Sequence, residues 1–337
     1  MTLRSRAVVG LCLLPLLMTP SATAAPALPA DAAGRVEPTP RVLAISVDAL
    51  NPQAMTRLGR GALPHLWRLV DEGAATLNAR SQYELTKTLP NHTSMLTGRR
   101  ITASLGGHGV TWNTDRPGTT VQRAAGHGVA SVYTVVHADG GRTAFFGTKA
   151  KFSLFERSWP AGIDRMVLHE GQDLRAVKAT RADLLARHRA FTFLHLGVAD
   201  RTGHDHGFMS PAYLDAVRRV DALVGKLLAA IDNHAELGDL IVVLTADHGG
   251  IGPSHYQVKE LGDIRVPFIA WGPGVEHGDL YAMNPSYANP GRTRPDLTGR
   301  QPVRNGDLAN LVTDLLGLGP VPGSRFDANQ QLRVLTE

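Results

Sequence analysis

Carboxylates and imidazoles follow several apolar segments of the chain at the points where those segments end. Asp48 directly follows RVLAISV (41–47), and Asp247 and His248 directly follow LIVVLTA (240–246). Carboxylate oxygen and imidazole nitrogen are ligands that zinc and similar divalent ions accept. The pattern therefore predicts a metal site, whose candidate ligands are Asp48, Asp200, His204, Asp247, His248 and His255.

Six such ligands exceed what one tetrahedral ion takes, whereas two ions about 3.5–4 Å apart would use them all. Thr88, in TKTLPNH (86–92), offers a hydroxyl that becomes a competent nucleophile beside a divalent cation. We expect a helix to begin near Pro90, just after Thr88, because the positive end of a helix favours an anion. Taken singly, such an Asp is often only a helix cap and such a His only a loop residue.

The elements that position these residues alternate between short buried segments and longer amphipathic ones. This alternation predicts a three-layer α/β/α sandwich with a mostly parallel central sheet, whose strands end along one edge. We expect residues 276–302, rich in Pro, Gly, Asn and Arg, to form a long surface excursion. The predicted strands are 41–47, 142–147, 191–196, 240–245 and 266–271, and the predicted helices are 63–73, 173–189, 211–232 and 305–317.

The first residues have the pattern of an export signal. A basic start precedes the apolar stretch 7–18, and SATAA offers a cleavage site, so we expect a signal peptide over 1–25 and a secreted protein. An uncleaved anchor is the alternative, and lipidation at Cys12 is disfavoured because the apolar stretch continues beyond it. Residues 26–40 are expected to be a flexible lead-in, and 41–337 a single catalytic domain without a transmembrane segment.

Composition limits the partners of the protein. The chain has 337 residues, 43% of them hydrophobic, which suffices for a large core. A net charge of +5 is too mild to indicate a nucleic acid polymer as partner. Cys12 is the only cysteine, so a mature chain would hold its metals through nitrogen and oxygen. The oligomeric state cannot be predicted from these features.

Taken together, these motifs resemble those of the alkaline phosphatase superfamily, and within it those of the type I phosphodiesterases or nucleotide pyrophosphatases. The resemblance covers most of residues 41–325. It rests on ISVDAL, on Thr-x-Pro-Asn-His, on Asp-x-x-x-His, and above all on TADHGG (245–250), with further likeness in 266–275 and 303–323. The resemblance implies an alkaline phosphatase-like fold and a phosphoester or pyrophosphate substrate.

The resemblance also implies a role for each site residue. It implies two divalent ions, expected to be Zn²⁺. One ion would be held by one group of ligands and bridged by the nucleophile Thr88, and the other ion would be held by a second group. Asn91 matches the position of an asparagine that holds a phosphate oxygen, although it could merely cap backbone. His277 is an alternative to the last ligand. The two groups are Asp48, Asp247 and His248, and Asp200, His204 and His255.

The sequence departs from nucleotide-cleaving relatives where two aromatic rings would sandwich a base. Those places hold Leu89 and His195, so a nucleotide-specific pocket is doubtful unless Tyr83 or Tyr256 supplies a ring. The slot TLPNH excludes a sulfatase, and no arginine clamp for a monoester is evident near Thr88. We expect a diester or pyrophosphate hydrolase that works through a phospho-threonine. A phosphomonoesterase and a non-catalytic metal-binding protein are the alternatives.

Overall fold

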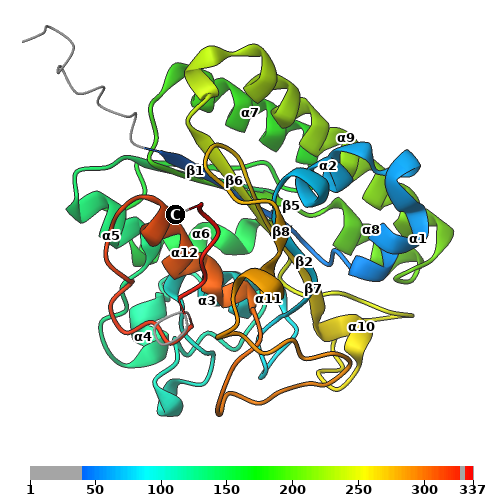
Figure 1. The fold of residues 1–337 in the computed structure, drawn as a ribbon. Helices are drawn as coiled ribbons and strands as arrows, with labels where there is room; N and C mark the ends of the chain where they lie inside the picture. The colour runs from blue at the N-terminus through cyan, green and yellow to red at the C-terminus, as the bar shows by residue number, and fades with distance from the viewer. Residues whose placement is uncertain (1–39, 327–330, 337) are drawn as a thin grey trace, which may run out of the picture. The chain divides into compact units, whose positions relative to one another are not determined.

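Eight strands form one sheet at the centre of the molecule in a computed structural model, which describes residues 40–326 and 331–336 (Figure 1). The spatial order is β4-β3-β5-β1-β6-β7-β2-β8. The predicted signal peptide, and the lead-in except Pro40, lie outside the described residues. The strands are β1 (Arg41–Val47), β2 (Ala74–Arg80), β3 (Thr143–Gly147), β4 (Arg165–Leu168), β5 (Phe191–Leu196), β6 (Leu240–Thr245), β7 (Arg265–Trp271) and β8 (Gly278–Asp279).

The centre of the sheet is parallel and fully buried. β1 pairs in parallel with β5 on one side and with β6 on the other. Every residue of these three strands is buried, which is the pattern expected of apolar strands covered on both faces. β7 is antiparallel to both of its neighbours, β6 and β2. The carboxyl ends of β5, β1 and β6 therefore lie side by side.

Helices cover both faces of the sheet, as predicted. α9 packs against α1, α2, α7 and α8 on one side, and α12 packs against α3 and α5 on the other. Figure 1 shows these two groups separated by the strands. The helices are α1 (Pro52–Ala62), α2 (Pro64–Glu72), α3 (Thr88–Thr97), α4 (Val121–Ala125), α5 (Val132–Ala138), α6 (Ser153–Ser158), α7 (Asp173–Ala186), α8 (Val198–His206), α9 (Pro211–Asn233), α10 (Leu261–Ile264), α11 (Leu280–Met283) and α12 (Leu308–Leu315). The three-layer α/β/α sandwich is confirmed.

Two sequence expectations need correction. α3 begins at Thr88 with Lys87 as its N-cap, two residues before the predicted start near Pro90. Residues 276–302 are more than a surface excursion, because they contain β8 and α11, and Leu280 and Tyr287 are buried. Among the residues that the structure describes, no helix has the length and apolarity needed to cross a bilayer.

Candidate active site

The predicted aspartate ligands lie at one edge of the sheet, where the three central strands end. Asp48 follows the end of β1, and Asp247 follows β6 after one residue. Asp200 lies in the first turn of α8, which starts two residues after β5. Because β1 lies between β5 and β6, these three carboxylates come from adjacent strand ends. This is the edge at which α/β sheets bind ligands.

One group of potential ligands consists of Asp48, Asp247 and His248, and all three are fully buried. One ligand atom from each lies within 4.8 Å of the others. His248 Nε2 is 3.2 Å from Asp247 Oδ2 and 3.6 Å from Asp48 Oδ1. The Nδ1 atom of His248 is 2.8 Å from the Gly249 carbonyl, which leaves Nε2 for an ion.

The backbone after β1 contributes to the geometry of this group. Ala49 has a φ of 62°, which is unusual for a residue other than glycine. Its N–H donates to Asp247 Oδ1 at 3.1 Å, and its carbonyl accepts from the Tyr213 hydroxyl at 2.6 Å. The strained turn is thus held by a buried tyrosine of α9 and fixes the orientation of a carboxylate.

A second group consists of Asp200, His204 and His255, whose ligand atoms also lie within 4.8 Å of one another. His204 is one helical turn after Asp200 in α8, and the two side chains are 3.4 Å apart. His255 Nε2 is 3.6 Å from Asp200 Oδ1, and its Nδ1 is 2.6 Å from the Thr86 carbonyl. His277, the alternative ligand, instead lines a shallow pocket beside β8.

The chemistry of both groups fits divalent cations. Four buried atoms in them make no hydrogen bond within the described residues: Asp48 Oδ1, Asp200 Oδ1, Asp247 Oδ2 and His248 Nε2. Buried polar atoms are rarely left unpaired without a reason. Burial lowers the pKa of His248, and it lowers that of His255 to about 2, so both rings are neutral and present a lone pair. Nitrogen and oxygen ligands of this kind suit zinc.

The crowded carboxylates perturb one another. Burial, and then repulsion from Asp48, raise the pKa of Asp247 far above its ordinary value. Burial alone would also raise the pKa of Asp48, but Lys149 and a hydrogen bond from His195 hold it well below its ordinary value. Three carboxylates therefore converge at a place that requires positive charge.

Thr88 shares a neighbouring side chain, Lys149, with both groups. It is the first residue of α3 and is 1% exposed. Its Oγ1 atom is 3.4 Å from Lys149 Nζ, which is also 2.5 Å from Asp48 Oδ2 and 2.6 Å from Asp200 Oδ2. A single ammonium group thus contacts the candidate nucleophile and one carboxylate of each ligand group. The structure places the hydroxyl next to both candidate metal sites.

Lys149 was not singled out in the sequence. It lies two residues beyond the end of β3, at the same edge of the sheet as the predicted ligands. Burial alone would lower its pKa, but the carboxylates of Asp48 and Asp200 raise it above the ordinary value. The rule that identified the aspartates, a polar residue just beyond a predicted strand, could also have identified this lysine.

Asn91 is fully buried, and its amide is occupied by other parts of the protein. Its Nδ2 atom donates to the carbonyls of Leu85 and Lys87, and its Oδ1 atom accepts from Gln82 N–H and from Asn305. In this structure the amide ties the loop before α3 to the helix. Its predicted contact with a phosphate oxygen would require breaking one of these bonds.

Asn113 is an amide that sequence reasoning missed. Its Oδ1 atom accepts from the N–H of Leu89 at 2.9 Å, directly beside Thr88. Its Nδ2 atom makes no hydrogen bond to any described residue, and the side chain is half-buried. It therefore offers a free donor next to the nucleophile. The sequence gives no local indication of this contact, because Asn113 and Leu89 are 24 positions apart and meet only in the folded chain.

Two other histidines support the ligands instead of lining an open pocket. His195 is fully buried, donates from Nε2 to Asp48 Oδ2 at 2.9 Å, and accepts from the Thr148 hydroxyl at Nδ1. His92 lies 2.8 Å from the Thr88 carbonyl and 2.9 Å from the Ser46 hydroxyl, which agrees with a supporting role. His206, at the end of α8, is exposed.

The side chains considered for substrate recognition differ in their availability. Leu89 and His195 are both fully buried, so neither can stack on a base. Tyr256 is 51% exposed and its ring centroid is 4.4 Å from that of the ligand His255, which makes it a possible stacking surface. The ring of Tyr83 is instead covered by the guanidinium of Arg294 at 3.7 Å.

The two arginines after Thr88 are engaged away from the site. Arg100 pairs with Glu84 at 2.8 Å. Arg99 donates to the carbonyls of Gly106 and Pro322. Neither of these two side chains is therefore directed to Thr88 in this structure.

Comparison with known families gives the site its context. The family model described as type I phosphodiesterase / nucleotide pyrophosphatase matches residues 42–267, which contain every candidate ligand. The chain belongs to this family. It is a family of phosphoester-processing enzymes whose members use two divalent metals.

Curated relatives share part of the chain. GPI ethanolamine phosphate transferase 1 of Neurospora crassa is 30% identical over 145 residues, which cover 41% of this chain and 14% of that protein. The enzymes of the same name from Gibberella zeae and Mus musculus are 28% and 26% identical over 52% and 39% of this chain and 19% and 14% of those proteins. The chain thus spans less than a fifth of the length of these relatives.

Solved structures support the fold. Murine ectonucleotide pyrophosphatase/phosphodiesterase 5, as an inactive variant with a threonine replaced by alanine and in complex with AMP, superposes with a TM-score of 0.65. The match covers 88% of this chain and all of that one, at 14% identity. A structure described only by that protein's name gives a TM-score of 0.62, with the same coverage and identity.

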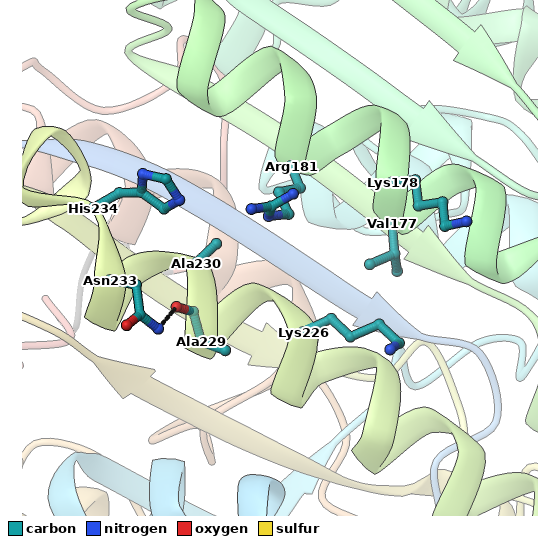
Figure 2. A pocket seen from close by; sticks show the side chains of 8 residues that line it. All are labelled: Val177, Lys178, Arg181, Lys226, Ala229, Ala230, Asn233 and His234. Atoms are coloured by element: carbon teal, nitrogen blue, oxygen red, sulfur yellow. Dashed lines mark hydrogen bonds between the residues drawn. The ribbon is translucent and has the colours of Figure 1, made fainter.

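A separate cavity of about 510 Å³ lies between α7 and α9 (Figure 2). Its floor includes Val177 and Ala230, and the side chains of Lys178, Arg181 and Lys226 surround it. It is lined by the helical layer instead of the strand ends. Because it contains neither the nucleophile nor a carboxylate among its lining residues, it is not the reaction site.

Proposed function

We propose that this protein is an exported phosphodiesterase or nucleotide pyrophosphatase that uses two divalent metal ions, Zn²⁺, and Thr88 as its nucleophile. The observation that carries the proposal is the shared ammonium contact: Lys149 Nζ contacts the Thr88 hydroxyl and one carboxylate of each ligand group. A protein that only bound metal would have no use for a hydroxyl at that position.

The two ligand groups would hold the two ions, one through Asp48, Asp247 and His248 and the other through Asp200, His204 and His255. When bound, such ions lower the pKa of the nucleophile and stabilise charge on the leaving oxygen. Hydrogen bonds to the Gly249 and Thr86 carbonyls fix the rings of His248 and His255, so that each presents Nε2 to an ion.

The reaction would take two steps. Thr88 Oγ1 releases its proton to water and attacks phosphorus in line, and a bond forms between them. The bond from phosphorus to the leaving oxygen breaks, and that oxygen takes a proton from water. Water then attacks the phospho-threonine and regenerates the hydroxyl. Asn113 offers its free Nδ2 donor to a phosphoryl oxygen during both steps, and the buried position of Thr88 limits competing solvent.

The substrate is a small phosphoester or pyrophosphate. Leu89 and His195 are buried, so they cannot stack on the two faces of a nucleotide base. Specificity for nucleotides would therefore depend on Tyr256. The inactive variant of the murine structural relative binds AMP, and it lacks a threonine, which supports a reaction that depends on this residue type.

The test uses zinc-loaded protein and bis-p-nitrophenyl phosphate. Thr88→Ala should retain its metal and lose at least about a thousandfold in kcat, as expected for a lost nucleophile. Thr93→Ala is a matched control in the same helix, where the hydroxyl only bonds the Leu89 carbonyl. Turnover by Thr88→Ala near the wild-type rate would overturn the assignment.

Transfer to an alcohol instead of water is a second candidate, favoured by the transferase relatives. Both candidates share the covalent Thr88 intermediate and differ only in the acceptor. Turnover in the presence of methanol distinguishes them: a transferase forms methyl p-nitrophenyl phosphate from the diester in excess of the hydrolysis product.

Export is inferred from residues 1–25 alone. Expression of the full chain in a secreting host should yield a mature protein that begins near Ala25. Protein retained in the cell with an intact N-terminus would contradict this.

A further inference from the structure

Lys149 has a more constrained environment than a surface lysine. Its side chain is 13% exposed, and its ammonium contacts Asp48, Asp200 and the Thr88 hydroxyl. It follows β3 directly before the short 3₁₀ helix η2 (Ala150–Phe152). A buried, twice-paired ammonium has a fixed position, so its charge acts at a defined place beside the nucleophile.

The charge of the site differs by one unit with and without this lysine. The two ligand groups contain three aspartates, so two divalent ions would leave one net positive charge when all three are ionised. Lys149 raises this to two. No other lysine or arginine of the described residues forms a hydrogen bond or ion pair with Thr88 or with the six ligands, and Arg99 and Arg100 are engaged elsewhere. Lys151 interacts with Asp48, Asp200 and Asp247 only through its charge at longer range.

Phosphate monoesters and diesters also differ in charge. The phosphoryl group of a diester carries one negative charge, whereas that of a monoester carries about 1.5 to 2 near neutral pH. A contact of 3.4 Å with Thr88 Oγ1 puts the ammonium within reach of the oxygens of a phosphoryl group bonded to that atom. The extra cation would therefore act on the group whose charge distinguishes the two substrate classes.

We propose that Lys149 is a further catalytic residue that allows this site to cleave phosphate monoesters as well as diesters. This inference rests on the proposed two-metal function of the same site. The Thr88 hydroxyl releases its proton to water as its oxygen forms the bond to phosphorus. The ester bond breaks, and the leaving oxygen takes a proton from water. A second water releases inorganic phosphate, and Lys149 remains protonated throughout.

The test compares kcat/KM for p-nitrophenyl phosphate and bis-p-nitrophenyl phosphate in zinc-loaded variants. Lys149→Met should reduce the rate on the monoester about tenfold more than the rate on the diester, because a close charge acts more strongly on a dianion. Lys149→Arg should largely keep the wild-type ratio. Lys178→Met, which removes an exposed charge on α7, is the matched control and should leave the ratio unchanged.

A binding measurement provides a readout without turnover. In a Thr88→Ala background, Lys149→Met should weaken binding of inorganic phosphate about tenfold and binding of dimethyl phosphate far less. Zinc content is measured in parallel, because loss of the metal would weaken both. If Lys149→Met does not fold, Lys149→Gln preserves a donor to both carboxylates and should give the same change.

The outcomes separate this inference from the proposed function. If the wild type cleaves the diester and the Lys149 variants lower both rates and both affinities equally, Lys149 only neutralises the carboxylates and the inference is wrong. If the zinc-loaded wild type cleaves neither ester, the proposed function itself fails. A selective loss on the monoester supports both.

Discussion

Zinc should stabilise this protein strongly, because the two ligand groups bury polar atoms without partners. Asp48 Oδ1, Asp200 Oδ1, Asp247 Oδ2 and His248 Nε2 make no hydrogen bond within the described residues. Each such atom costs about 1–3 kcal/mol of folding free energy. An ion that binds only the folded state at a hundred times its Kd contributes about 2.7 kcal/mol, so two ions contribute about 5 kcal/mol.

The expected shift in Tm follows from the size of the domain. Domains of 150–250 residues gain about 2–4 °C for each kcal/mol, and larger domains gain less. The low end of this range applies to residues 41–337, so zinc should raise Tm by about 10 °C over protein in a chelator. Asp200→Asn removes a charged ligand from one group and should roughly halve this zinc-induced shift. Differential scanning calorimetry at matched protein concentration measures it.

The matched control is Asp205→Asn, which changes an exposed carboxylate of the same helix α8. It should retain the full zinc-induced shift. The reasoning is refuted if zinc raises Tm equally in Asp200→Asn and Asp205→Asn, or if it does not raise the Tm of the wild type. Either result would mean that these carboxylates do not bind the ion.

Two other predictions concern stability and specificity. Burial lowers the pKa of His108 from 6.5 to about 3, so below pH 6.5 the unfolded chain gains a proton that the folded chain lacks and stability falls. In chelator, the stability lost between pH 7.5 and pH 5 should be about 2 kcal/mol smaller in His108→Gln than in the wild type or in the exposed His127→Gln, as measured by urea unfolding; equal losses would contradict this. Tyr256→Ala should raise KM about fivefold or more for thymidine 5′-monophosphate p-nitrophenyl ester, and not for ethyl p-nitrophenyl phosphate, since stacking contributes about 1–3 kcal/mol. A similar change for both esters would show that Tyr256 does not stack on the base.

The predictable part of the fold is its buried centre. The buried strands could be predicted because each is a short, mainly apolar segment of the sequence. These strands are β1, β5, β6 and β7. β2 was missed because AATLNAR has few β-branched residues, and its place next to β7 is decided by tertiary pairing. α3 was predicted to start too late, because it is buried on all sides and lacks an amphipathic period.

The candidate ligands were predictable because they flank those buried strands. Each of the three aspartates comes within four residues of a strand end, which local sequence shows directly. Lys149 was missed although it lies two residues beyond β3, where the same local rule applies to a lysine. Asn113 could not be predicted, because its importance arises from a contact with Leu89, 24 positions away. Asn91 shows the converse: its motif is local, but its amide bonds with Gln82 and Asn305 appear only in the folded chain.

The stereochemistry at phosphorus tests the central claim most directly. A chiral phosphorothioate diester is hydrolysed in isotopically labelled water by the zinc-loaded enzyme, and the configuration of the product is determined. Attack by Thr88 followed by attack of water inverts phosphorus twice, so the account predicts retention. Net inversion would show that water attacks the substrate directly, and would contradict a covalent role for Thr88.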